Sequence, residues 1–105
     1  MIVRVIPLAD GDINTLADEL EENRRGQGAK FLTAYRAAAE SIEQFPQMYP
    51  EVEDGVPGLE IRNAILVKFE LRVIYAIWKG EAVIVAVIHA RRRSDSWQSR
   101  LTELD

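Results

Sequence analysis

The chain contains no cysteine and only one histidine among its 105 residues. Without cysteine it can form neither a disulfide scaffold nor a thiolate metal ligand or nucleophile. One histidine cannot complete a zinc site, so we expect no metal and no cofactor. The chain also lacks a run of about 18 apolar residues, which argues against a membrane-spanning helix and a membrane partner. The cytoplasm is therefore the compartment that we expect.

Strongly basic character is also missing, because the net charge is −4 at pH 7. A domain that coats nucleic acid is usually basic overall. The charge is unevenly distributed: residues 1–60 carry 12 acidic and 5 basic side chains, whereas residues 61–105 carry 5 acidic and 8 basic ones. An anionic partner would therefore meet the C-terminal half, and a solvated surface without function is the alternative.

The chain does contain enough apolar sequence for one hydrophobic core, since 48% of its residues are hydrophobic. Its length suits a single domain over residues 1–105. Apolar periodicity predicts strands over residues 1–8, 60–67, 69–78 and 82–90, and helices over residues 13–24, 29–44 and 97–104. The fold class is then α+β, in the order β-α-α-β-β-β-α, with a helical hairpin packed on a largely antiparallel four-stranded sheet.

Local signals predict where several of these elements begin and how they are placed. Residues 9–12 are typical of a turn in which Asp10 or Asp12 caps the first helix. Residues 94–96 can cap the last helix in the same way. The strand over 82–90 is apolar on both faces, which predicts a central position in the sheet.

The third predicted strand alternates between apolar and charged residues. Its odd-numbered residues over 67–77 are apolar or aromatic, whereas Lys68, Glu70 and Arg72 alternate with them. We expect the odd set to meet the helices and the opposite face to be partly open at the beginning of the strand. Together with Arg62 of the preceding strand, Lys68 and Arg72 would form a cationic face suited to phosphate.

The last apolar strand leads into a cationic end. His89, which on strand alternation shares a face with Val83, suits general acid–base catalysis. The alternative is a partly buried histidine that is hydrogen-bonded at the end of a strand. Three consecutive arginines, Arg91, Arg92 and Arg93, could contact RNA, DNA or an acidic partner. The alternative is salt bridging to the acidic helices of the same chain, and we expect at least one of these arginines to be paired in this way.

Two further groups of residues are candidate sites. Trp97 and Arg100 lie one helical turn apart, and we expect the indole to seal the edge of the core rather than to stack on a base. Glu51, Glu53 and Asp54 lie in a proline-rich loop, where carboxylates without a histidine or regular spacing are expected to be solvated rather than metal-bound. No glycine-rich phosphate loop, Ser/His/Asp set or paired-carboxylate signature is recognisable.

The order of elements and the spaced residues resemble a known group of proteins, the RelE/ParE superfamily. Its members are toxins of type II toxin–antitoxin modules, often labelled plasmid stabilisation proteins. The resemblance covers nearly the whole chain. It rests on Tyr35-x6-Ile42-x2-Phe45-Pro46-x2-Tyr49-Pro50, then Ile61-Arg62, then Lys68-Phe69 with Tyr75, and Val87-x-His89-x2-Arg92-Arg93-x3-Trp97-x2-Arg100.

The resemblance implies one of two activities. RelE-like members are ribosome-dependent endoribonucleases that cut mRNA in the decoding site with basic residues and often a C-terminal Tyr or His. The corresponding candidates are Arg62, Lys68, Arg72, His89 and Arg92. ParE-like members share the fold, lack that set and poison DNA gyrase. No tyrosine follows Arg93, and a protein that works inside ribosomal RNA is expected to be basic, so the chain is more similar to the ParE-like side.

The sequence therefore predicts a ParE-like toxin that inhibits gyrase by binding and is neutralised by a cognate antitoxin within a toxin–antitoxin hetero-oligomer. The antitoxin of such systems wraps the toxin with a segment that folds on binding. We expect an acidic amphipathic segment to dock on the sheet–helix groove and the basic strand end. The residues expected to contact the target or the antitoxin are Arg91, Arg92, Arg93, Trp97 and Arg100. The alternatives are an mRNA endonuclease that acts on the ribosome and a non-toxic binding protein with the same fold.

Overall fold

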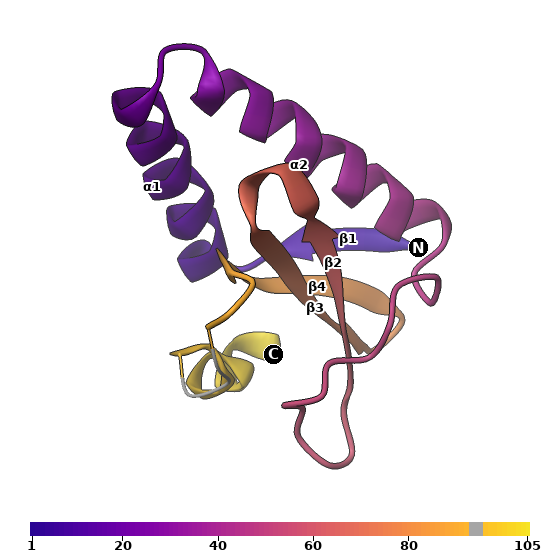
Figure 1. The fold of residues 1–105 in the computed structure, drawn as a ribbon. Helices are drawn as coiled ribbons and strands as arrows, with labels where there is room; N and C mark the ends of the chain where they lie inside the picture. Colours follow the sequence, from indigo (N-terminus) through magenta and orange to yellow (C-terminus); the bar gives the residue numbers. More distant parts are fainter. Residues whose placement is uncertain (93–95) are drawn as a thin grey trace.

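The computed structural model describes residues 1–92 and 96–105. A helical hairpin lies along one side of a four-stranded sheet, and the C-terminal segment lies on the other side (Figure 1). The predicted fold class and order of elements are confirmed. The elements are β1 (Ile2–Val5), α1 (Pro7–Asn23), α2 (Gln27–Gln44), β2 (Glu60–Leu66), the 3-10 turn η1 (Val67–Phe69), β3 (Leu71–Trp78), β4 (Glu81–His89) and the 3-10 helix η3 (Gln98–Leu104).

The sheet has the strand order β1-β4-β3-β2, so β4 is central as its apolar sequence predicts. Strands β2, β3 and β4 are antiparallel neighbours, whereas the short β1 pairs with β4 in parallel. This parallel pairing ends at Val5 opposite Ile84, although β4 continues to His89. Among the described residues, no strand therefore lies beside the second half of β4 on that side.

Helix α1 begins at Pro7, six residues earlier than periodicity predicts. Proline suits the first helical position because its fixed φ is helical and that position needs no N–H donor. The N–H of Asp10 donates to the carbonyl of Ile6 at 3.0 Å, which closes the first turn. The predicted turn over residues 9–12 is therefore wrong, and neither Asp10 nor Asp12 caps the helix.

The two helices approach each other closely where α2 begins. A Cβ atom on Gly28 would lie 2.6 Å from the carbonyl oxygen of Ala17, so only glycine fits there without movement of the backbone. The Glu21 carboxylate accepts the N–H groups of Gly26 and Gly28 at 3.0 and 3.1 Å. These bonds satisfy donors that the start of a helix otherwise leaves unpaired.

The connection between β2 and β3 is the turn η1, followed by Glu70 in the left-handed region with φ 54°. The third strand consequently begins at Leu71 rather than at residue 69, and Lys68 is not part of the sheet. Arg72 is only 7% exposed. The predicted open cationic face is therefore wrong, because the loop before β2 folds back over it and pairs Glu51 with Arg62.

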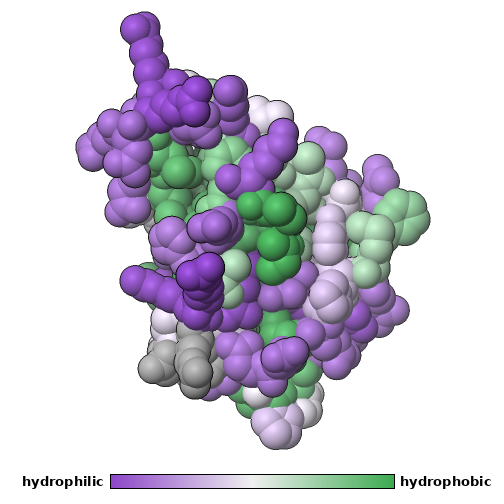
Figure 2. Space-filling view, viewed as in Figure 1, coloured by the Kyte–Doolittle hydropathy of each residue, from purple (hydrophilic) through white to green (hydrophobic). Residues whose placement is uncertain are grey.

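Both faces of the sheet are covered, and residues 71–76 of β3 and 82–88 of β4 are all buried. On the helical side, Phe31 of α2 packs edge-on against Phe69, and the two ring centroids lie 5.9 Å apart. On β3, Ile74 and Tyr75 pair with Ala86 and Ile84 of β4, which leaves Val85 as an extra, bulged residue. Hydrophilic side chains cover most of the face shown in Figure 2, with apolar atoms near its centre.

The bulge changes which residues of β4 share a face. An extra residue inverts the alternation of side chains beyond it. His89 and Val87 therefore share a face with Ile84 and Ala82, not with Val83 as strict alternation predicts.

The C-terminal segment forms a 3-10 helix over Gln98–Leu104 instead of the predicted α-helix. Residues 94 and 95 of the predicted cap lie outside the described residues. Trp97 is fully buried, as the sequence predicts for a residue that seals the core. Among the described residues, no helix combines the length and the apolar character needed to cross a membrane.

Candidate functional site

Strand β4 ends at His89 and is followed by Ala90, Arg91 and Arg92; we call these four residues the strand-end segment. The Ala90 N–H donates to the carbonyl of Glu70, and the Arg92 N–H donates to the carbonyl of His89, both at 2.9 Å. The side chains of His89, Arg91 and Arg92 are exposed. Hollows of about 640, 420 and 590 Å³ adjoin this segment. It therefore presents cationic groups among concave surfaces.

Arg72 lies beneath this segment in a buried polar network. Its guanidinium group contacts the Asp54 carboxylate at 3.2 Å and donates to the Asn63 side-chain oxygen at 3.3 Å. It also donates to the main-chain carbonyl of Arg92. Of the three nitrogen atoms of this guanidinium group, Nε has no hydrogen-bond partner among the described residues. Arg72 thus ties the loop before β2 to the strand-end segment, and its charge is already balanced by Asp54.

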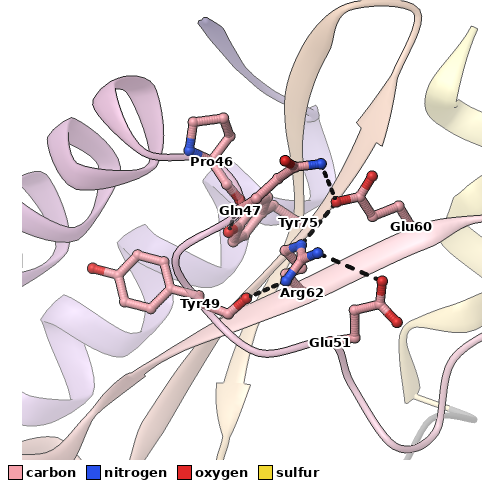
Figure 3. Close-up of polar contacts among 7 residues, drawn as sticks. All are labelled: Pro46, Gln47, Tyr49, Glu51, Glu60, Arg62 and Tyr75. Atoms are coloured by element: carbon pink, nitrogen blue, oxygen red, sulfur yellow. Dashed lines mark hydrogen bonds and ion pairs between the residues drawn. The ribbon is translucent and has the colours of Figure 1, made fainter.

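Arg62 occupies a second network, at the side of β2 that faces the loop (Figure 3). It donates to Glu60 at 2.8 Å and to the carbonyl of Tyr49 at 2.7 Å, and Glu51 lies 3.6 Å away. The hydrogen bond from Arg62, followed by that from Gln47, lowers the pKa of Glu60. Two carboxylates therefore neutralise this arginine as well.

Tyr75 anchors the chain just after α2. Its hydroxyl donates to the carbonyl of Pro46, beside the Arg62 network (Figure 3). Burial raises the pKa of the hydroxyl from 10.0 to about 12. Tyr75 is therefore neutral at physiological pH and acts as a hydrogen-bond donor to the loop.

Arg100 forms an ion pair with Asp12 of α1, at 2.6 Å, rather than a surface contact. It also donates to the carbonyl of Val85 at 3.1 Å, and Asp12 accepts the N–H of Val87 at 3.1 Å. A salt bridge between the basic C-terminal half and an acidic helix therefore exists, but not at the consecutive arginines for which it was predicted. Arg100 makes it, whereas among the described residues neither Arg91 nor Arg92 has an ion pair.

The nuclease candidates do not converge on one site. The main chains of Arg72, His89 and Arg92 are close, because Arg72 donates to the Arg92 carbonyl and Leu71 pairs with His89. Arg72 itself pairs with Ile88, so the side chains of Arg72 and His89 lie on opposite faces of the sheet. Arg62 pairs with Tyr75, which lies three residues, or about 10 Å, beyond Arg72 along β3. Lys68 lies in η1, beside a hollow against α2.

The structure places the remaining predicted site residues in different environments. Trp97 is fully buried, so its side chain offers no contact surface. Arg93 lies outside the described residues. Of the loop carboxylates predicted to be solvated, Asp54 instead pairs with Arg72, whereas Glu51 is largely exposed and lies 3.6 Å from Arg62. No group of three or more potential metal ligands occurs in the part of the chain that the structure describes.

Sequence reasoning missed the acidic partners of these arginines. Asp54 lies 18 residues from Arg72 in an irregular loop, and Asp12 lies 88 residues from Arg100. The opposite charges of the two halves were a general signal that such pairs form. No local pattern could say which carboxylate meets which arginine.

Comparison with known proteins agrees with this fold. The family model for the ParE toxin of the type II toxin–antitoxin system, parDE, matches residues 3–94. A solved chain of the chromosomal ParDE toxin–antitoxin system from P. aeruginosa superimposes with a TM-score of 0.71 at 14% identity, over 85% of this chain and 95% of that chain. No curated protein matches.

The match to the family model over residues 3–94, on a chain that folds as a helical hairpin on a mixed sheet, defines a protein of the RelE/ParE superfamily. Within it, the chain belongs to the ParE toxin family of type II toxin–antitoxin systems. The resemblance found in the sequence is confirmed. Membership of a toxin–antitoxin system implies a cognate antitoxin as partner.

Proposed function

We propose that this ParE-family toxin acts in the cytoplasm as a single domain, poisons DNA gyrase by binding to it and is not an enzyme. The cognate antitoxin neutralises it within a hetero-oligomer. The family match supports the general role. The burial and pairing of Arg72 support the choice of binding over RNA cleavage.

A ribonuclease must stabilise charge that develops on a phosphate, and it needs free cations and a proton-transfer group aimed at one place. Arg72 and Arg62 already bind carboxylates of the same chain. A phosphate would have to displace Asp54 or Glu60 to reach them. Such a displacement would leave a partly buried carboxylate unpaired, which is costly.

The strand-end segment supports the binding role. Arg91 and Arg92 are exposed and have no ion pair among the described residues. They are therefore available to an acidic surface of a partner protein, to which arginine donates in a planar fork. The segment follows β4, which is one of the two inner strands of the sheet, so its start is held by neighbouring strands.

DNA supercoiling by purified gyrase, with this protein titrated in and the antitoxin absent, tests the proposal. We expect inhibition or trapped cleaved DNA with the wild-type protein and a clear loss of potency with Arg91→Ala/Arg92→Ala. Arg36→Ala, which removes an exposed cation of α2 that has no ion pair among the described residues, is the matched control. Unchanged supercoiling at a large excess of wild-type protein would contradict the proposal.

A second assay addresses the alternatives. Ribosomes that translate a defined message should yield no cleavage when the protein is added. Cleavage that His89→Gln abolishes would establish the nuclease instead. Inactivity in both assays would leave the non-toxic binding protein.

A further inference from the structure

Helix α2 and the turn η1 enclose a hollow of about 530 Å³ that none of the arginine networks reaches. We call it the two-lysine hollow, because Lys30 and Lys68 flank it. Its apolar lining includes Ala34, Ala37 and Phe69. Figure 2 shows apolar atoms exposed near the centre of the face on which η1 lies in Figure 1. Val67, the first residue of η1, is 77% exposed.

Phe69 in the lining of the hollow is held in place by the core, and the Thr33 hydroxyl beside it already has a hydrogen-bond partner. Phe69 packs edge-on against Phe31, which is fully buried in the core. The Thr33 hydroxyl in the wall already donates to the carbonyl of Ala29 at 3.1 Å. The small side chains of α2 also let a partner backbone approach closely. The hollow is therefore suited to an apolar side chain.

The charges around the hollow are of one sign. Lys30 and Lys68 are both exposed, no acidic residue lines the hollow, and within residues 1–92 and 96–105 neither lysine has an ion pair. This is unusual in a chain of net charge −4. Helix α1 carries six acidic and no basic residues, so it repels an acidic segment that the hollow attracts.

We propose that the two-lysine hollow binds the antitoxin, and that its occupant is an apolar side chain flanked by carboxylates on an acidic amphipathic segment. Lys30 and Lys68 would pair with these carboxylates while the apolar side chain covers Phe69. The inference rests on the proposed neutralisation by an antitoxin, and it is independent of gyrase. It assigns antitoxin binding to a surface other than the strand-end segment.

Titration calorimetry with the antitoxin of the same module tests the inference. Lys30→Glu/Lys68→Glu should weaken binding at least tenfold and reduce its salt dependence, since two charge pairs become repulsive. Ala37→Leu, which fills the hollow without a change of charge, should also weaken binding at least tenfold. Arg36→Glu, an exposed cation of α2 outside the hollow, should change affinity less than twofold.

The outcomes separate the inference from the proposed function. Equal affinity of the wild type and both hollow variants, with unchanged melting temperatures, would overturn the inference and leave neutralisation intact. A wild-type protein that does not bind the antitoxin would overturn neutralisation itself, and the inference with it. A homodimer that Ala37→Leu dissociates, with antitoxin binding unchanged, would assign the hollow to a second copy and overturn the inference.

Discussion

Asp12 and Arg100, 88 residues apart, pair at 2.6 Å with only 17% of each side chain exposed. The pair lies where β4 extends beyond the end of β1. There it accepts the Val87 N–H and donates to the Val85 carbonyl, two main-chain groups that no strand satisfies. A side-chain ion pair thus replaces the missing end of β1 and fastens η3 to the sheet.

Asp12→Ala should lower the free energy of unfolding by about 2–4 kcal/mol, because it removes the counter-charge of Arg100 and leaves the Val87 N–H without its acceptor. Chemical denaturation measures the loss. Asp10→Ala, in the same helix but exposed, should stay within about 0.5 kcal/mol of the wild type. Equal effects of the two substitutions would show that the pair does not secure the edge of β4.

Arg72→Ala should also be destabilising, by about 2–4 kcal/mol, because Asp54 and the Arg92 carbonyl both lose their partner. An arginine on an open sheet face would instead cost very little. Arg91→Ala is the control, with an expected change within about 0.5 kcal/mol. Coinciding denaturation curves of the two variants would contradict the burial and pairing of Arg72.

The buried Tyr75 hydroxyl predicts a loss of stability at alkaline pH. Because its pKa rises to about 12 in the folded protein, the fold favours the protonated form. This contribution is complete below pH 10, the ordinary pKa, and is lost as the pH rises from 10.0 to about 12. The loss amounts to about 3 kcal/mol. Tyr75→Phe should lack it, which denaturation at pH 9 and pH 11.5 can measure in both proteins.

Two glycines in the helical hairpin should respond in opposite directions to the same substitution. Gly28→Ala places a methyl group against the Ala17 carbonyl and should cost about 1–3 kcal/mol. Gly11→Ala, inside α1 with nothing within 4 Å of the added atom, should gain about 0.5–1 kcal/mol. Thermal melts of the two variants decide this, and a shift of the same sign in both would contradict the close approach at Gly28.

By itself, the sequence determined the elements that periodicity and turn chemistry encode. The doubly apolar run ending at His89 indicated a central strand, and the spaced apolar residues of the two helices indicated a hairpin over a sheet. The spaced motifs from Tyr35 to Arg100 indicated the superfamily. These features are local or repeat at a constant interval, so they can be recognised without knowing which distant segments meet.

Only the tertiary structure decided which arginines are free. Arg72 reads as a surface residue on alternation alone, and it is buried because a loop 18 residues away returns with Asp54. Arg100 reads as a contact residue and is paired because α1 begins early enough to carry Asp12 to the edge of β4. Periodicity predicts on which face of the sheet a side chain lies. Whether an oppositely charged partner lies there too depends on how distant segments pack.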